Sequence, residues 1–301
     1  MVAITGATGN TGSVAASMLL DHGEAVRVIG RSAERLEPFR IRGAEPAVGD
    51  QGDVDFLTRA FEGADAAYIL IPPKFDAEDI RAYYRTLGEA AVSAIRRSGL
   101  RKVVFLSSLG ADRSAGTGPV LGLHDIEQMF ETLTDVDFAI LRPGYFMENT
   151  LGTLELIRTK GVNGSSIPPD APIMLVASKD IGTKAAELLM ERTFTGRSII
   201  ELTGDRLSYA KITAVIARAL EITHLPYIQF SDDDAIASFR AMGLSMSVAQ
   251  SYVEMAHGIG QGMVTTTTIE PFRFSAPTRF TEFVDKVFKP AFMAVEHHEM
   301  A

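Results

Sequence analysis

The chain has 301 residues, of which 46% are hydrophobic and 22% are charged, so it is long enough to bury a large core in one or two domains. Its formal net charge of −9 disfavours nucleic acid as the main partner, because no excess of basic residues is available to neutralise phosphates. The sequence contains no cysteine, which excludes disulfide bonds, thiolate nucleophiles and cysteine-ligated metal sites.

Two further features bear on where the protein works. No uninterrupted apolar run is long enough to form a membrane-spanning helix, and residues 1–6 lack the basic and apolar regions of a signal peptide. We therefore expect a soluble cytoplasmic protein that does not act on a membrane. The histidines show no metal-ligand spacing, so no metal site is expected.

Strand and helix signals alternate through the first half of the chain. Strands are predicted at Val2–Thr5, Ala25–Ile29, Pro46–Val48, Ala66–Ile71, Lys102–Leu106 and Phe138–Leu141. Helices are predicted after Gly12, after Ser32, at Asp76–Ser98 and around His124–Leu133. Apolar strands that alternate with helices of this length indicate βαβ units and a doubly wound parallel sheet of the α/β class. Ligands of such sheets bind at the carboxyl ends of the strands.

The pattern loosens after about residue 145. Helices are predicted at Leu151–Arg158, Ser178–Arg192, Ser208–Leu220, Asp232–Met242, Ser247–Gly258 and Arg279–Phe288, and short strands at Ile173–Val176, Ile199–Leu202 and Tyr227–Phe230. Gly262–Pro277 is predicted to be a loop. The sequence favours a smaller α+β lobe laid against the first half, with some segments returning to the main sheet.

A glycine-rich segment lies between the first strand and the first helix. Its Gly-x-x-Gly-x-x-Gly spacing allows a tight turn and a close approach of the backbone to a pyrophosphate, and the helix N-terminus adds unpaired N–H groups. The alternative is a glycine-rich turn without a ligand, but its place in a βαβ unit favours a dinucleotide. The expected contacts are Gly6, Thr8, Gly9, Asn10, Thr11 and Gly12.

The end of the second strand indicates which dinucleotide binds. An acidic residue there would accept hydrogen bonds from a ribose 2′-hydroxyl, but this chain has Arg31. A guanidinium favours a 2′-phosphate, so we expect NADPH in preference to NADH unless Arg31 is merely a solvated surface residue. Asp50, after the third strand, is predicted either to accept a bond from the adenine amino group or to cap the next helix, as Asp53 also could.

Five segments together resemble the NmrA-like group of atypical short-chain dehydrogenases/reductases. They are TGATGNTG at 5–12, LIPP at 70–73, FLSSLGA at 105–111, LRPGYFMEN at 141–149 and PTRFTEFV at 277–284. The resemblance implies a Rossmann-type NAD(P)-binding domain over residues 1–149 and a mainly substrate-binding lobe over 150–301. The LRPGYFMEN run gives a candidate substrate pocket that includes Tyr145, Phe146 and Asn149. Ile71, Pro72 and Ser107 lie at the carboxyl ends of the fourth and fifth strands, which predicts cofactor contacts there.

The chain departs from the classical dehydrogenases in one respect. Those enzymes use a Tyr-x-x-x-Lys pair as the proton donor, whereas none of the seven tyrosines here has a lysine four residues later. His124 falls near the usual lysine position and is the predicted catalytic side chain, although it could equally be a solvent-facing histidine or one bonded to a backbone carbonyl. If His124 is the acid, its replacement by alanine should lower turnover roughly a hundredfold.

Chemistry without the pair suits acceptors that are already electron-poor. The resemblance implies a reductase that transfers hydride from NADPH to a quinone, an azo compound or a related dye, where positioning carries most of the catalysis. The alternatives are an NADP(H)-sensing regulator without turnover and, less favoured, a nucleotide-sugar epimerase or dehydratase. A small molecule is the expected partner. The Asp76–Ser98 helix could also form a homodimer, or could simply cover the sheet.

Overall fold

The computed structural model describes residues 1–267 and 273–299, and its centre is a sheet of eight parallel strands. The strands are β1 (Val2–Thr5), β2 (Val26–Gly30), β3 (Glu45–Val48), β4 (Ala66–Ile69), β5 (Lys102–Leu106), β6 (Asp137–Pro143), β10 (Arg197–Thr203) and β13 (Arg273–Ser275). Their order is β13-β10-β6-β5-β4-β1-β2-β3. The chain therefore changes direction across the sheet between β1 and β4, which is where such sheets bind ligands.

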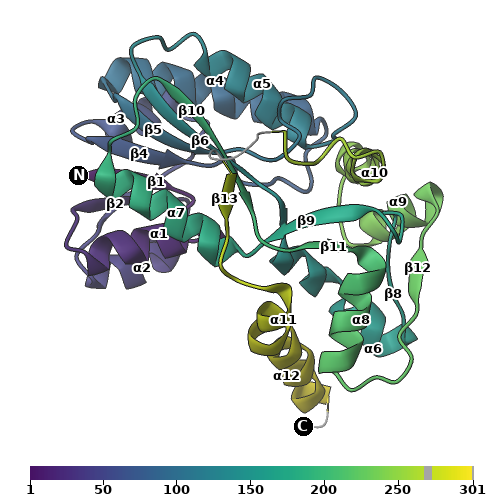
Figure 1. The fold of residues 1–301 in the computed structure, drawn as a ribbon. Helices are drawn as coiled ribbons and strands as arrows, with labels where there is room; N and C mark the ends of the chain where they lie inside the picture. The colour runs from purple at the N-terminus through teal and green to yellow at the C-terminus, as the bar shows by residue number, and fades with distance from the viewer. Residues whose placement is uncertain (268–272, 300–301) are drawn as a thin grey trace.

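Helices cover both faces of this sheet, as Figure 1 shows. One face carries α1 (Asn10–Asp21), α2 (Ala33–Ile41) and α7 (Ser178–Glu191), and the other carries α3 (Val54–Phe61), α4 (Ile80–Ser98) and α5 (Val120–Phe130). Because both faces are covered, the central strands are almost continuously apolar, and all four residues of β1 and of β4 are buried. The predicted doubly wound α/β fold is confirmed.

The smaller lobe is built mainly from residues after β6. Its three-stranded sheet contains β7 (Tyr145–Phe146), β9 (Pro172–Val176) and β11 (Arg206–Ser208), and β8 (Asn163–Ser165) pairs with β12 (Tyr227–Gln229). Its helical parts are the 3-10 helix η1 (Met147–Thr153), α6 (Leu154–Lys160), α8 (Tyr209–Ala219), α11 (Phe280–Phe283), the π-helical turn η2 (Val284–Phe288) and α12 (Lys289–Glu299). These elements enclose a separate apolar core.

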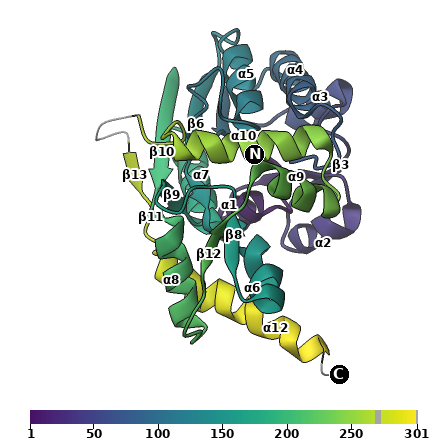
Figure 2. The ribbon, with the colours of Figure 1, turned by 90° about the vertical axis from the view of Figure 1, so that its right-hand side faces the viewer.

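A pair of helices connects the two parts of the molecule. They are α9 (Asp232–Ala241) and α10 (Met246–Gly260), and Figure 2 shows α10 running between the helices of the main sheet and the smaller lobe. The described residues, 1–267 and 273–299, include no helix that is both long and apolar enough to cross a membrane.

Several predicted boundaries were wrong for local reasons. The long helix begins at Ile80 and not at Asp76, because Asp79 caps it by accepting a hydrogen bond from the Ala82 N–H at 2.8 Å. The following helix begins one turn earlier than predicted, at Val120. Gly122 makes the first turn of this helix hard to recognise in the sequence. Glycine is needed there because a Cβ would be 2.5 Å from the Tyr84 ring.

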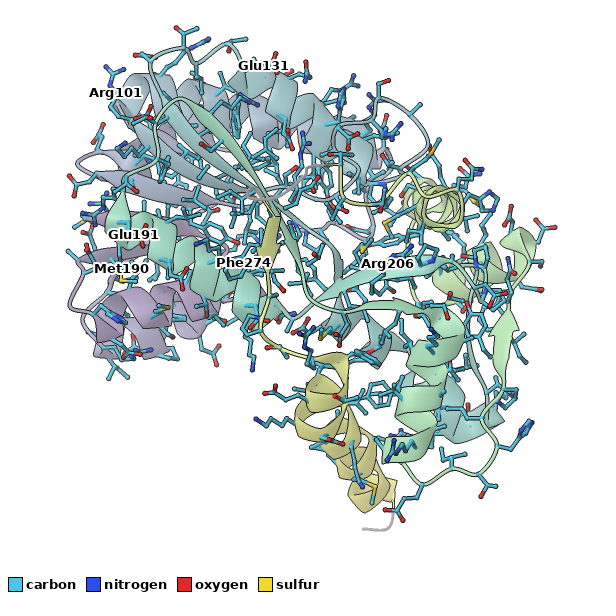
Figure 3. The ribbon with its side chains drawn as sticks, in the orientation of Figure 1. Arg101, Glu131, Met190, Glu191, Arg206 and Phe274 are labelled. Carbon is cyan, nitrogen blue, oxygen red and sulfur yellow. The ribbon has the colours of Figure 1, made fainter. Side chains whose placement is uncertain are left out.

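The stretch predicted as a loop, Gly262–Pro277, contains the edge strand β13, although residues 268–272 lie outside the described part of the chain. Arg273–Ser275 forms this strand by pairing with Glu201–Thr203 of β10. Phe274, labelled in Figure 3, packs toward α7, with the Lys184 ammonium 5.0 Å from the centre of its ring. Tertiary pairing, not local periodicity, therefore forms the strand.

Candidate functional site

The glycine loop joins β1 to α1 at the point where the strand order reverses. The Thr5 hydroxyl accepts a hydrogen bond from the Leu70 N–H at 2.9 Å, which ties the ends of β1 and β4 together. Gly6 has a left-handed backbone with φ of +60°, and a Cβ there would be 2.6 Å from Leu70. A Cβ on Gly12 would be 2.3 Å from the Gly6 carbonyl oxygen, so α1 can start this close to the loop only with glycine.

The N-terminus of α1 presents unpaired backbone donors. Gly9 is the N-cap and has no side chain to satisfy them, and the first turn contains no acidic residue. Gly9 and Asn10 are exposed, whereas the hydroxyl of buried Thr11 accepts a hydrogen bond from the Tyr68 hydroxyl at 3.0 Å. The loop therefore offers N–H groups and a partial positive charge at an open surface, an arrangement that fits a pyrophosphate.

Two arginines lie beside this loop. Arg31 is exposed directly after β2, and Ser32 caps α2 by accepting a hydrogen bond from the Arg35 N–H. The Arg35 guanidinium donates to the Thr8 carbonyl at 3.1 Å, which fixes α2 against the glycine loop. Burial raises the pKa of Tyr83, and the positive charge of nearby Arg31 opposes that rise. The charge of Arg31 thus acts on Tyr83 of α4, a relation that the sequence did not reveal.

The helix-capping alternative for Asp50 is resolved in favour of Asp53. The Asp53 carboxylate accepts hydrogen bonds from the Asp55 and Phe56 N–H groups at 2.9 and 3.0 Å and so caps α3. Asp50 is exposed, and one of its oxygens accepts from the Gly52 N–H at 2.7 Å. An adenine contact for Asp50 therefore stays a prediction, and the exposure of its side chain is compatible with it.

The chain segment after β4 runs beside the same edge. Ile71 is buried, and the Pro72 carbonyl accepts a hydrogen bond from the Tyr83 hydroxyl at 3.3 Å. The glycine loop, Arg31, Asp50 and the Ile71–Pro72 segment thus all follow carboxyl ends of neighbouring strands of the main sheet, and their contacts with a cofactor stay a prediction.

Ser107 has an internal partner that the sequence did not reveal. Its hydroxyl donates to Glu127 at 2.5 Å, and the Arg142 guanidinium donates to both oxygens of the same carboxylate, at 3.1 and 2.6 Å. All three side chains are buried. Because the Ser107 proton already bonds Glu127, this hydroxyl can only accept from a ribose; its position at the end of β5 is as predicted.

His124 lies on α5 and is also oriented by the loop after β5. Its Nδ1 is 2.8 Å from the Ala111 carbonyl oxygen. A carbonyl oxygen only accepts, so Nδ1 carries a hydrogen and donates it to this oxygen. Any exchange of a proton with a substrate would therefore fall to Nε2. This is the backbone-bonded arrangement that the sequence left open.

The three predicted substrate residues do not share one environment. Phe146 packs against the core between the sheet and α7, and Asn149 is exposed on η1. Tyr145 is half-buried on β7 and packs against the core of the smaller lobe, where burial raises its pKa to about 12. Of the three residues, only Tyr145 both follows the carboxyl end of β6 and packs against the core of the smaller lobe.

Helix α10 packs on the loop between β5 and α5 almost backbone to backbone. A Cβ on Gly118 would be 1.9 Å from the Ser251 carbonyl oxygen, and one on Gly258 would be 2.3 Å from that of Gly116. The loop that orients His124 is thus held against α10, which lies between the helices of the main sheet and the smaller lobe. Residues 1–267 and 273–299 contain no group of three or more histidine and carboxylate side chains that could hold a metal ion.

Comparison with known proteins confirms the family resemblance. The model of the NmrA-like family matches residues 1–283. A (4-alkanoyl-5-oxo-2,5-dihydrofuran-3-yl)methyl phosphate reductase from Streptomyces griseus is 28% identical over 220 residues, which cover 73% of this chain and 74% of that protein.

Solved structures show the same fold. The NADPH-dependent quinone oxidoreductase of Escherichia coli, complexed with NADPH, is 22% identical, has a TM-score of 0.81, and covers 96% of this chain and 100% of its own. The Citrobacter triphenylmethane reductase, complexed with NADP(H), is 18% identical, has a TM-score of 0.80, and covers 95% of this chain and 99% of its own.

Proposed function

The chain belongs to the NmrA-like family, and on that premise we propose that it is an NADPH-dependent reductase of a small, conjugated, electron-poor acceptor. A quinone, an azo compound and a cationic dye are the acceptor classes. The observation that carries the proposal is the glycine loop, where Gly12 lies so close to Gly6 that no side chain fits and the start of α1 is open to a pyrophosphate. The reductases similar to this chain support the reaction class.

The preference for NADPH rests on charge. Arg31 is the first residue after β2, it is exposed, and no acidic side chain occupies that strand end. The 2′-phosphate of NADPH would accept charge-assisted hydrogen bonds from its guanidinium. Arg35 supports the arrangement because its bond to Thr8 joins α2 to the glycine loop.

When bound, the reduced nicotinamide supplies a hydride. The residues of this chain would bind and orient it: the glycine loop would hold the pyrophosphate, and the buried Ser107–Glu127–Arg142 cluster fixes the ends of β5 and β6 relative to each other. A conjugated acceptor is reduced mainly through such positioning, so the missing Tyr-x-x-x-Lys pair does not prevent the reaction.

The test is to follow NADPH and NADH oxidation with a panel of quinones, azo dyes, triphenylmethane dyes and simple ketones. We expect turnover of the conjugated acceptors, with NADPH preferred, and none of the ketones. NADP(H) binding measured by calorimetry without turnover of any acceptor would instead favour an NADP(H)-sensing regulator. Absence of dinucleotide binding would refute both.

His124 gives a further prediction. We propose that it positions the loop after β5, because its Nδ1–H is bonded to the Ala111 carbonyl. His124→Ala should therefore lower kcat by less than about tenfold, the value of one hydrogen bond. His124→Asn, which keeps a donor near the place of Nδ1, should restore most of this loss. A fall of about a hundredfold in both variants would instead show that His124 is the acid.

A further inference from the structure

Lys74 is an exposed lysine in the segment between β4 and α4. Its ammonium nitrogen is 5.6 Å from the centre of the Tyr83 ring. The Tyr83 hydroxyl donates to the Pro72 carbonyl at 3.3 Å, and the Lys74 carbonyl accepts a hydrogen bond from the Ala77 N–H at 3.2 Å. Tyr83 on α4 thus contacts this segment at two residues, and the lysine side chain extends over its ring.

Tyr83 lies on the side of α4 that faces the turn after β3. Leu87 follows it by one helical turn on the same side, and a Cβ on Gly52 in that turn would be 3.4 Å from Leu87 and 3.2 Å from the Asp50 carboxylate. Tyr83 and Leu87 also pack in one apolar cluster with Ala47 of β3. Because α4 runs antiparallel to the strands, Tyr83 is the closer of the two to the carboxyl ends of the sheet. The cation over its ring is therefore held on the side of β4 where β2 and β3 end.

Arg31 begins at the neighbouring strand end. The Gly49 N–H donates to the Gly30 carbonyl at 3.0 Å, which ties β2 to β3 just before Arg31 and the turn that follows β3. In the part of the chain that the structure describes, neither Arg31 nor Lys74 forms an ion pair with a carboxylate. Two exposed cations therefore lie near this turn, one at the end of β2 and one in the segment after β4.

The local charge explains why a second cation is needed. Burial raises the pKa of Tyr83, the charge of Arg31 opposes this rise, and the charges of exposed Asp50 and Asp76 add to it. With one arginine against two carboxylates, these groups alone are net negative, whereas a phosphate monoester brings nearly two further negative charges at neutral pH. Lys74 offsets the second carboxylate, and its ammonium group binds phosphate as a point charge that needs no fixed geometry.

Resting on the proposed reductase function, we infer that Lys74 is a second ligand of the 2′-phosphate of NADPH and, together with Arg31, determines the preference for NADPH over NADH. Dinucleotides bind along the carboxyl edge of a sheet of this kind, where the strand order reverses between β1 and β4. Tyr83 is the positioning residue, because its ring holds the ammonium group by a cation–π contact and leaves N–H donors for phosphate oxygens.

Lys74→Gln tests this role, because glutamine keeps much of the length of the side chain and removes its charge. We expect the Kd for NADPH to rise about tenfold and the Kd for NADH to change less than about twofold, since only NADPH carries the 2′-phosphate. Lys74 is exposed, so the melting temperature should not change. Calorimetric titrations with the two cofactors give the ratio without any need for turnover.

A smaller pair of probes locates the effect at the adenosine end of the cofactor. Adenosine 2′,5′-bisphosphate carries the 2′-phosphate without the nicotinamide, and adenosine 5′-monophosphate lacks it. Lys74→Gln should weaken binding of the bisphosphate about as much as that of NADPH and should leave binding of the monophosphate unchanged. In the double variant, Arg31→Ala with Lys74→Gln, NADPH should bind no more tightly than NADH.

Two matched variants complete the test. Lys74→Arg keeps the positive charge and should keep the preference for NADPH, and Lys211→Gln removes an equally exposed lysine from α8 of the smaller lobe and should change neither Kd. An unchanged Kd for NADPH in Lys74→Gln, or equal losses of NADPH and NADH, would overturn the inference and leave the proposed function standing. A wild-type protein that binds neither dinucleotide would refute the proposed function itself.

Discussion

Gly12→Ala is expected to raise the Kd for NADPH at least a hundredfold, a loss of about 3 kcal/mol. The added Cβ would be 2.3 Å from the Gly6 carbonyl oxygen and 2.8 Å from its carbon, and neither backbone atom can rotate away as a flexible side chain could. The start of α1 must therefore move from the loop, and its N–H groups no longer converge on the pyrophosphate. Calorimetric titration with NADPH measures the effect.

A control separates this local change from loss of the fold. Overpacking of this size costs about 1–3 kcal/mol of stability, so Gly12→Ala should melt at a lower temperature and still fold. Gly152→Ala places a methyl group on η1 with no heavy atom within 4 Å, and it should change neither the melting temperature nor the Kd. An unchanged Kd in folded Gly12→Ala would show that the loop does not bind the pyrophosphate.

The main sheet and the glycine loop were predictable because their signals are local. Each central strand is an apolar run that both layers of helices bury, and the spacing from Gly6 to Gly12 is set by one turn and one helix start. The edge strand β13 was not predictable, because its three residues form a strand only by pairing with β10, which lies far earlier in the chain.

The interior of the site was harder to predict because its contacts join distant segments. The sequence pattern predicts that Glu127 is an ordinary exposed position of a helix. In the fold its carboxylate is buried and bonded to both Ser107 and Arg142. An arginine inside an otherwise apolar strand is the one signal that could have indicated a buried partner. No motif connects Tyr145 with Tyr209, yet both belong to the core of the smaller lobe, where the β7–β9–β11 sheet brings β7 near the start of α8.

Arg31→Ala is expected to weaken NADPH binding about ten- to a hundredfold, while the Kd for NADH changes less than threefold. A hydrogen bond to a charged group contributes about 1.5–3 kcal/mol, and only NADPH carries the 2′-phosphate that would accept it. Arg31 is exposed at the end of β2, so removing its side chain leaves no buried group unpaired and should leave the melting temperature unchanged. Parallel titrations with both cofactors give the ratio.

Two variants on the neighbouring helix sharpen the result. Arg35→Ala removes a bond to the Thr8 carbonyl, so it should weaken NADPH and NADH alike through the shared glycine loop. Arg40 lies further along α2, where it pairs with Glu37, and Arg40→Ala should affect neither cofactor. If Arg31→Ala left the ratio of the two Kd values unchanged, the 2′-phosphate would have to be recognised elsewhere. A selective loss of NADPH affinity would place this recognition at the end of β2, where the sequence has a cation in place of the carboxylate that a free 2′-hydroxyl prefers.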